Sequence, residues 1–169
     1  MNQLEKFRDV HTFIFDVDGV MTDNQILITE AGELLRKMNV RDGYAIKKAV
    51  QEGFRVCIIT GGSSEGVRKR LEGLGVVDIY AGRQQKMEAF EAFVLKYDLD
   101  LHGILYMGDD FPDRAVMRRV GVPTCPSDAI PEILEFVDYI SPFKGGDGCV
   151  RDVIEKVLKL QDKWLPEND

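Results

Sequence analysis

The sequence has no long hydrophobic run, few cysteines, and fewer basic than acidic residues. Its first ten residues, "MNQLEKFRDV", lack the apolar core of a signal peptide. No apolar run approaches the roughly 18 residues that are needed to span a bilayer. The 22 basic residues against 29 acidic ones leave a net charge of −7, which argues against non-specific binding to nucleic acid or to an anionic membrane. We therefore expect a cytoplasmic protein that has neither nucleic acid nor a membrane as partner.

Nothing in the sequence indicates disulfide bonds, a zinc site or a second domain. Cys57, Cys125 and Cys149 are odd in number, widely spaced and without a CxxC pair. The chain has 169 residues, 44% of them hydrophobic, which is enough for one domain with a substantial core. Because no repeat or linker divides it, we expect a single domain over residues 1–169.

The pattern of hydrophobic residues predicts an α/β fold. Short β-branched or aromatic runs alternate with longer amphipathic stretches, which is typical of βαβ units. We expect a three-layer, Rossmann-like, doubly wound parallel sheet. Its strands are predicted at residues 11–17, 55–60, 77–81, 103–108 and 137–140. Its helices are predicted at residues 42–52, 64–74, 85–97, 112–120 and 149–163, the last followed by a tail to residue 169.

One segment breaks the alternation. The stretch "QILITEAGELLRKMNV", residues 25–40, predicts a β-hairpin that turns at Glu30–Gly32 and is inserted after the first strand. Only 43 residues separate Asp16 from Thr60, and 25 separate Thr60 from Lys86. Neither interval can hold a folded cap domain as well as its own helix and strand, so we expect no cap domain.

Polar residues follow three of the predicted strands at their carboxyl ends. Asp16 and Asp18 follow the first strand, Thr60 and Gly61 the second, and Asp109 and Asp110 the fourth. In an open parallel sheet, ligands bind at this edge. Carboxylates gathered there repel one another unless a cation lies between them, and oxygen ligands suit Mg²⁺. Two other interpretations of Asp16 and Asp18 are a simple turn cap and an EF-hand loop, but the latter requires glycine at its sixth position and Gly19 stands at the fourth.

Four motifs in order carry a resemblance to a known family. "FDVDGVMTD", "IITGG", Lys86 and "GDDFPD" resemble the motifs of the haloacid dehalogenase-like phosphohydrolase superfamily. "NVRDGYAIKKAV", "YAGRQQKMEAF" and "GGDGCVRDVIEKVL" extend the resemblance, from about residue 11 to 160, to the 3-deoxy-D-manno-octulosonate 8-phosphate phosphatases of lipopolysaccharide sugar biosynthesis. The resemblance implies a Mg²⁺-dependent phosphatase of the subclass without a cap domain. A signalling receiver domain also combines Asp, Thr and Lys on such a sheet, but it would not carry D-x-D-G on its first strand.

The resemblance implies a role for each catalytic residue. Asp16 would be the nucleophile that forms an aspartyl phosphate, and Asp18 would act as general acid and then general base. Mg²⁺ would be held by the Asp16 side chain, the Asp18 backbone carbonyl and Asp109. Thr60, with the backbone amides of Gly61 and Gly62, would bind phosphate oxygens, and Lys86 would supply positive charge. Asp110 and Asp113 would support Lys86 and the metal without binding it directly.

Other residues are implied in substrate recognition. The segment Asn39, Val40, Arg41, Asp42 and Gly43 would lie near the substrate, and Arg70, Lys86 and Arg151 would contact the anionic sugar acid or its phosphate. Two positions depart from the family pattern, because Gly62 and Lys47 stand where arginine is frequent. These departures leave open a nonulosonate 9-phosphate, a substrate of the sialic-acid type. A further alternative is a non-catalytic oligomerising partner of a sugar-activating synthetase.

The expected hairpin bears on assembly. Its arms carry "ILI" and "LL", and an exposed apolar two-stranded unit tends to pair with copies of itself. Without a cap domain the site would be open to water, so a neighbouring subunit has to close it. We expect a closed homo-oligomer, and the resemblance implies a homotetramer.

Overall fold

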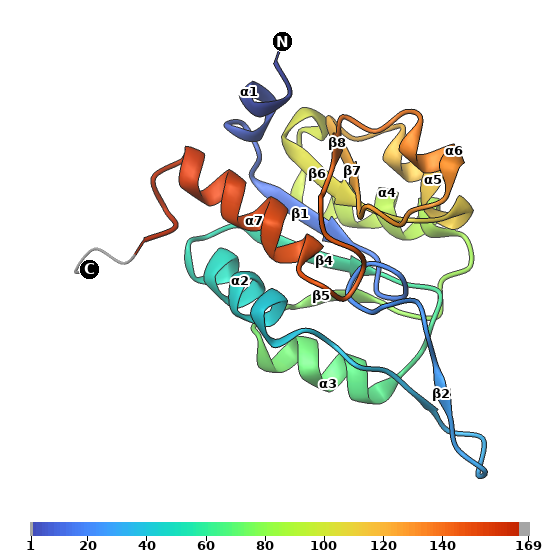
Figure 1. Ribbon diagram of the computed structural model, residues 1–169. Coiled ribbons are helices and arrows are strands. Elements are labelled where there is room, and N and C mark those ends of the chain that lie inside the picture. Colours follow the sequence, from blue (N-terminus) through green and yellow to red (C-terminus); the bar gives the residue numbers. More distant parts are fainter. Residues whose placement is uncertain (1, 166–169) are drawn as a thin grey trace.

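A parallel sheet of six strands forms the centre of the structure, a computed structural model that describes residues 2–165 (Figure 1). The spatial order of the strands is β5-β4-β1-β6-β7-β8, and every neighbouring pair is parallel. The strands are β1 (Thr12–Phe15), β4 (Arg55–Ile59), β5 (Asp78–Tyr80), β6 (Ile104–Met107), β7 (Val122–Cys125) and β8 (Tyr139–Ile140). The predicted α/β fold with a doubly wound parallel sheet is therefore confirmed.

The central strand β1 divides the hydrophobic core between the two faces of the sheet. Successive side chains of a strand point to opposite faces. Phe13 and Phe15 accordingly pack into one apolar cluster and Ile14 into the other, and all three are fully buried. The register pairs Phe15 with Ile58 of β4 and with Met107 of β6. The residues that follow these strands therefore emerge together at one edge of the sheet.

Helices cover both faces of the sheet, which gives the expected three layers (Figure 1). One face is covered by α2 (Val40–Gln51), α3 (Glu65–Gly73) and α7 (Cys149–Leu160), and Phe7 of α1 (Gln3–Phe7) joins their core. The other face is covered by α4 (Lys86–Tyr97), α5 (Phe111–Met117) and α6 (Pro131–Leu134). A short 3₁₀ helix, Leu101–Gly103, leads into β6. No helix within residues 2–165 is long and apolar enough to cross a membrane.

The expected hairpin is present and projects from the body of the molecule (Figure 1). Its strands, β2 (Leu27–Ile28) and β3 (Leu34–Leu35), are antiparallel, with Leu27 opposite Leu35 and Ile28 opposite Leu34. All four of these side chains are exposed, Leu27 by 68% and Ile28 by 67%. The regular strands are shorter than the predicted range of 25–40, and the chain after β3 runs back toward α2.

Several predicted elements differ from those observed. The strand β7 was not predicted, because Pro123 lacks an N–H donor and such a residue argues against a central strand. The short helices α1 and α6 were also not predicted. Helix α2 begins at Val40 rather than 42, since the Asn39 side chain caps it by accepting from the backbone N–H groups of Arg41 and Asp42. The last helix ends at Leu160 rather than 163, and the end of the predicted tail, 166–169, lies outside the described residues.

Candidate active site

The carboxyl ends of β1, β4 and β6 meet at a cavity of about 330 Å³. All four predicted catalytic residues line it, together with the predicted metal ligand Asp109. The complete lining is Asp16, Asp18, Asn24, Thr60, Gly61, Gly62, Arg83, Gln84, Lys86, Asp109, Asp110 and Pro112. The parallel register brings together side chains that are more than 90 residues apart in the sequence, as the spacing of the motifs predicts.

Asp16 lies directly after β1 and is bound to Lys86. Its Oδ1 is 2.9 Å from Lys86 Nζ and accepts a hydrogen bond of 2.7 Å from the backbone N–H of Val17. Asp16 is buried, and this burial, together with the charge of Asp113, raises the pKa of its carboxyl, which Lys86 opposes. A positive charge is therefore needed beside Asp16 to keep it ionised, and Lys86 supplies one.

Asp113, on the first turn of α5, holds Lys86 in place. Its fully buried carboxylate accepts hydrogen bonds from Lys86 Nζ at 2.7 Å, from the Tyr106 hydroxyl at 2.6 Å and from the backbone N–H of Asp109 at 3.2 Å. Burial opposes the charged form of Lys86, but Asp113 and Asp16 outweigh it and raise the pKa of the ammonium. Asp113 therefore contacts Lys86, and the supporting role that was predicted for it stays a prediction.

The carboxylates of this site can accommodate a hard cation. Asp16, Asp109 and Asp113 each offer an oxygen atom, and these atoms lie within 4.8 Å of one another. The Oδ1 atom of Asp109 is buried and has no hydrogen-bond partner among residues 2–165. Burial and the charges of Asp113 and Asp110 raise the pKa of Asp109 to about 7. Because the oxygens of Asp113 are already occupied by three donors, Asp16 and Asp109 are the side chains that fit a divalent cation.

Asp110 lines the same cavity, but its side chain forms a hydrogen bond with the backbone of the next residue. Its side chain accepts from the backbone N–H of Phe111 at 2.7 Å and caps α5. The supporting role toward Lys86 and the metal that was predicted for Asp110 stays a prediction.

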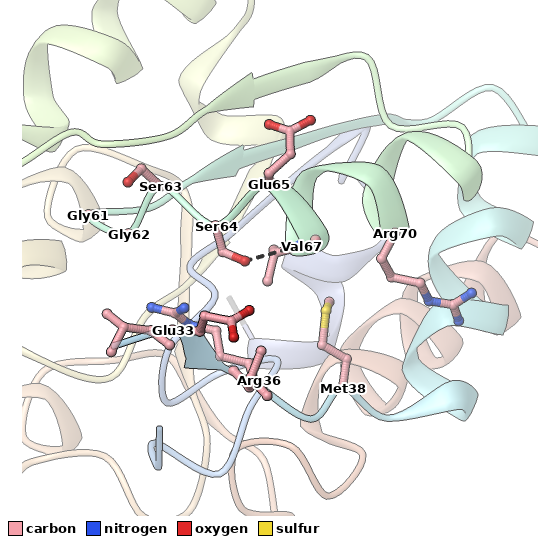
Figure 2. A pocket seen from close by; sticks show the side chains of 13 residues that line it. Glu33, Arg36, Met38, Gly61, Gly62, Ser63, Ser64, Glu65, Val67 and Arg70 are labelled. Carbon is pink, nitrogen blue, oxygen red and sulfur yellow. Dashed lines mark hydrogen bonds between the residues drawn. The ribbon is translucent and has the colours of Figure 1, made fainter. Parts of the chain in front are cut away.

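Thr60 and the loop after β4 form the side of the cavity that was predicted to bind phosphate. Thr60 donates its backbone N–H to the Tyr80 carbonyl at 2.9 Å, and its hydroxyl accepts from the N–H of Gly62 at 3.3 Å. The loop then leads into α3, whose N-cap Ser64 accepts from the N–H of Val67 (Figure 2). A second loop is fixed to this one, because Arg83 donates its N–H to the Thr60 carbonyl at 3.0 Å.

Asp18 forms an ion pair that the sequence did not predict. Arg36, just after β3 of the hairpin, donates from Nε to Asp18 Oδ1 at 2.6 Å and from Nη2 to Oδ2 at 3.2 Å. This hydrogen bond raises the pKa of Arg36, although burial opposes the shift. The segment after the hairpin therefore places a charged side chain against Asp18, a residue that lines the catalytic cavity.

A larger groove of about 900 Å³ lies beside the catalytic cavity, between the hairpin and α3 (Figure 2). Gly61 and Gly62 line both spaces, so the two adjoin. Arg70, a predicted substrate ligand, lines this groove rather than the catalytic cavity. Its guanidinium lies against Gly43 of α2, where there is no room for a Cβ atom. Contact of Arg70 with a substrate stays a prediction.

The remaining predicted substrate residues do not line the catalytic cavity. Asn39, Val40, Arg41 and Arg151 line a separate cavity of about 520 Å³. Asp42 is buried and accepts from the N–H of Arg151, so that it links α2 to the start of α7. Lys47 is exposed on α2 and lines none of these three cavities. A role for these residues in substrate binding stays a prediction.

Arg151 has partners within its own subunit. Its Nε donates to Glu155 at 3.2 Å, and its guanidinium lies over the rings of Tyr44 and Trp164 at 5.6 and 5.2 Å. These contacts direct the side chain toward α2 and the chain after α7.

Sequence reasoning missed four residues of the cavity lining, Asn24, Arg83, Gln84 and Pro112. It also missed Arg36 and Tyr106, which contact Asp18 and Asp113. The position of Arg83, three residues before Lys86 in the loop that faces Thr60, was a signal that could have identified it. Arg36 and Tyr106 gave no such signal, because one follows an apolar hairpin arm and the other lies inside an apolar strand.

Comparisons with known proteins identify relatives of this chain in both sequence and structure. No protein-family model matches the chain. The 3-deoxy-D-manno-octulosonate 8-phosphate phosphatase KdsC of Salmonella typhi is 37% identical over 160 residues, which cover 95% of this chain and 85% of that protein. The crystal structure of the corresponding phosphatase from Yersinia pestis has a TM-score of 0.93 and 35% identity, and the match covers 95% of this chain and 87% of that one.

A further solved structure shows what a relative binds. The 3-deoxy-D-manno-octulosonate 8-phosphate phosphatase from Moraxella catarrhalis, in complex with a magnesium ion, a phosphate ion and KDO, has a TM-score of 0.92 and 32% identity. The match covers 96% of this chain and 93% of that one. With four ordered motifs converging on one cavity and relatives of this similarity over nearly the whole length, the chain belongs to the 3-deoxy-D-manno-octulosonate 8-phosphate phosphatase family of the haloacid dehalogenase-like superfamily.

Proposed function

We propose that the protein hydrolyses 3-deoxy-D-manno-octulosonate 8-phosphate to the free sugar acid and phosphate, as a step of lipopolysaccharide sugar biosynthesis in the cytoplasm. The observation that carries the proposal is the buried contact of Asp16 with Lys86, beside the unpartnered oxygen of Asp109. Phosphoryl transfer requires a nucleophilic carboxylate, here Asp16, a fixed positive charge, here Lys86, and a free oxygen ligand for a metal ion, here Asp109. Family membership supports the choice of reaction.

The reaction has two steps. First, an Asp16 oxygen attacks phosphorus, the bond between phosphorus and the sugar oxygen breaks, and Asp18 gives its proton to that oxygen. Second, a water molecule attacks the phosphorus of the aspartyl phosphate, Asp18 takes the water proton, and the bond to Asp16 breaks. Asp18 ends protonated and Asp16 ends as a free carboxylate, so the site is restored. Lys86, held by Asp113, balances negative charge throughout.

Mg²⁺ is the cation that this site suits. Asp16, Asp109 and the backbone carbonyl of Asp18 would hold it, and oxygen ligands are those that Mg²⁺ prefers. When bound, the ion neutralises carboxylate charge and so allows a phosphate dianion to approach. The magnesium and phosphate ions in the Moraxella catarrhalis relative support this assignment.

The relatives favour an octulosonate over a nonulosonate substrate. The Salmonella typhi and Yersinia pestis proteins both carry the octulosonate name, and KDO is bound in the Moraxella catarrhalis structure. The groove between the hairpin and α3 offers Arg70 to the distal end of such a substrate. The uncommon residues Gly62 and Lys47 remain the positions at which the preference of this chain can differ from that of its relatives.

We further propose a homotetramer in which the hairpins pair. Leu27, Ile28, Leu34 and Leu35 form an exposed apolar surface on a two-stranded unit, which is marginally stable alone. A neighbour seated there would also cover the open groove beside the catalytic cavity. Val40 and Tyr44, near the start of α2, are also exposed, by 76% and 54%.

A phosphate-release screen tests the reaction. The purified protein is assayed with Mg²⁺ against octulosonate 8-phosphate, nonulosonate 9-phosphate and simple sugar phosphates, and we expect the highest kcat/KM for the first. Excess chelator should abolish activity, and added Mg²⁺ should restore it. Asp16→Asn should abolish turnover and, by mass spectrometry, form no phosphoryl adduct. Activity of Asp16→Asn within about tenfold of wild type, equal to about 1.4 kcal/mol in the barrier, would refute the nucleophile assignment.

A further inference from the structure

Arg36 reaches the general acid from an element that stands outside the catalytic motifs. Its side chain is only 7% exposed, although the neighbouring Leu34 and Leu35 are about half exposed. Its two contacts with Asp18, at 2.6 and 3.2 Å, form the forked pairing that guanidinium makes with carboxylate. Within residues 2–165, no other hydrogen bond to the Asp18 carboxylate is present.

The pair of Arg36 and Asp18 lies close against Gly62. A Cβ atom at Gly62 would lie 3.1 Å from Arg36 Nη2 and 3.5 Å from Asp18 Oδ2. The first distance is tighter than most Cβ contacts, so a methyl group at this position would require the guanidinium to shift by a few tenths of an ångström. Figure 2 shows Arg36 entering this region from the hairpin, opposite the loop of Gly61 and Gly62.

The orientation of the Asp18 carboxyl group determines how well Asp18 can act as a general acid. A general acid must place its proton within hydrogen-bond reach of one particular leaving oxygen, and misplacement lowers the rate steeply. The Asp18 side chain is 32% exposed and has no neighbour that fixes it except Arg36. Lysine could supply the charge but not the planar fork, because its ammonium is a point charge on a flexible stem.

We propose that Arg36 is a positioning residue that aims the Asp18 carboxylate at the leaving-group oxygen. This inference rests on the proposed function, since it assumes that Asp18 protonates the departing sugar. Arg36 itself exchanges no proton and need not touch the substrate. Because Arg36 directly follows β3, the hairpin must be ordered for Arg36 to align the general acid.

Dependence on the leaving group tests the proposal. An alkyl phosphate such as octulosonate 8-phosphate needs a proton on its departing oxygen, whereas the phenolate of p-nitrophenyl phosphate leaves without one. For both substrates kcat/KM reports the steps through the first irreversible one, so hydrolysis of the aspartyl phosphate does not obscure the comparison. Arg36→Met should lower kcat/KM for the alkyl substrate by about 30-fold or more, up to the roughly 10²–10⁴-fold contribution of a general acid, and for the aryl substrate by less than about threefold.

Two variants bracket this effect. Arg36→Lys should recover part of the alkyl activity, because charge returns without the fork. Lys37→Met is the matched control, since Lys37 is the next residue and its side chain is 90% exposed. Its Nζ lies 3.9 Å from an Asp23 carboxylate oxygen, which is a loose surface ion pair. Its kcat/KM should stay within about twofold of wild type for both substrates. Arg36→Lys also covers the case in which Arg36→Met is poorly folded, because it keeps a long, positively charged side chain at this position.

Asp18→Asn separates failure of this inference from failure of the proposed function. If Asp18→Asn lowers alkyl and aryl activity equally, Asp18 is not the general acid, and the proposed role of Asp18 is wrong together with that of Arg36. If Asp18→Asn is selective but Arg36→Met is not, only the positioning role is overturned. In the double variant, Arg36→Met should cause no further alkyl loss beyond that of Asp18→Asn, because the residue acts only through Asp18. A full additional loss in the double variant would contradict the proposal.

Discussion

The carboxylate of Asp109 occupies the space that a side chain on Gly19 would need. A Cβ atom built on Gly19 overlaps the Asp109 carboxylate, and the backbone of Gly19 has a φ of +85°, which other residues adopt at a cost. Gly19 therefore allows the loop after β1 to pass directly beneath the predicted metal ligand. This contact links the first motif of the chain to the last.

Gly19→Ala should displace Asp109 and abolish activity. We expect a fall of about 10²-fold or more at moderate Mg²⁺, because a ligand of the cation is moved. The apparent Mg²⁺ requirement, measured by titration of the initial rate, should rise. Gly53→Ala is the matched control, since Gly53 has a φ of +86° but nothing within 4 Å of its Cβ position. It should lose about 1–2 kcal/mol of stability through backbone strain alone and keep its Mg²⁺ dependence. Equal effects of the two substitutions on Mg²⁺ dependence would contradict the account.

Asp113→Asn should disable the site although Asp113 touches no substrate. The change removes the charge that holds Lys86 Nζ at 2.7 Å, so the lysine is left with Asp16 alone. We expect kcat to fall by about 10²-fold or more, as for loss of a preorganised charge. Breaking this buried pair should also cost about 3–5 kcal/mol of folding stability, measured by denaturant unfolding.

Tyr106→Phe is a milder change than Asp113→Asn at the same hydrogen-bonded group and serves as its comparison. It removes one neutral donor, at 2.6 Å, and leaves the pair of Lys86 and Asp113 intact. Stability should fall by about 1 kcal/mol and kcat by less than about tenfold. If Tyr106→Phe were as inactive as Asp113→Asn while folded, the hydroxyl rather than the charge would hold Lys86.

The sequence predicted the centre of the site but not its surroundings. Asp16, Thr60 and Asp109 each follow a strand, and parallel strands bring their carboxyl ends together whatever lies between them. Arg36 could not be predicted in this way, because its contact with Asp18 depends on how the hairpin returns to the body of the domain. Likewise, Asp42 lies in a stretch that was assigned to the substrate, yet its neighbour in space is the N-terminus of α7, a tertiary contact without local signal.

Asp42 should make stability depend on pH. Burial and, less strongly, the charge of Asp147 raise its pKa to about 6, against the hydrogen bond from the Arg151 N–H that lowers it. The folded state thus binds this proton more tightly than the unfolded chain. Its stabilising contribution is complete below pH 4 and is lost as pH rises through about 6. The rise of about two pKa units corresponds to about 3 kcal/mol at most.

Asp42→Asn isolates this contribution. Asparagine keeps an oxygen that can accept from the Arg151 N–H but does not ionise. Relative to wild type, its free energy of unfolding should therefore increase between pH 4 and pH 7, measured by urea unfolding at each pH. Asp9→Asn, a change at an exposed carboxyl, is the control and should follow the wild-type curve. Parallel curves for Asp42→Asn and wild type would show that Asp42 does not retain a proton in the fold.

Charged substitutions on the hairpin should dissociate the assembly. Leu27→Asp and Ile28→Asp each place a carboxylate on the exposed apolar arms, where pairing with a second copy would bury it. We expect sedimentation to show smaller species at assay concentration. The KM for the sugar-acid phosphate should rise by about tenfold or more, equal to about 1.4 kcal/mol of binding free energy, because the neighbour no longer covers the groove. Activity toward small phosphate esters should largely remain.

Leu95→Asp is the matched control for the hairpin substitutions. Leu95 is 83% exposed on α4, on the face of the sheet opposite α2 and α3, so the same charge is introduced on a similarly exposed leucine. This variant should sediment like wild type and keep its KM. If Ile28→Asp stays assembled, or dissociates with an unchanged KM, the neighbour does not complete the substrate site. In the first case the interface lies elsewhere on the surface, and in the second each subunit recognises the sugar acid with its own groove and Arg70.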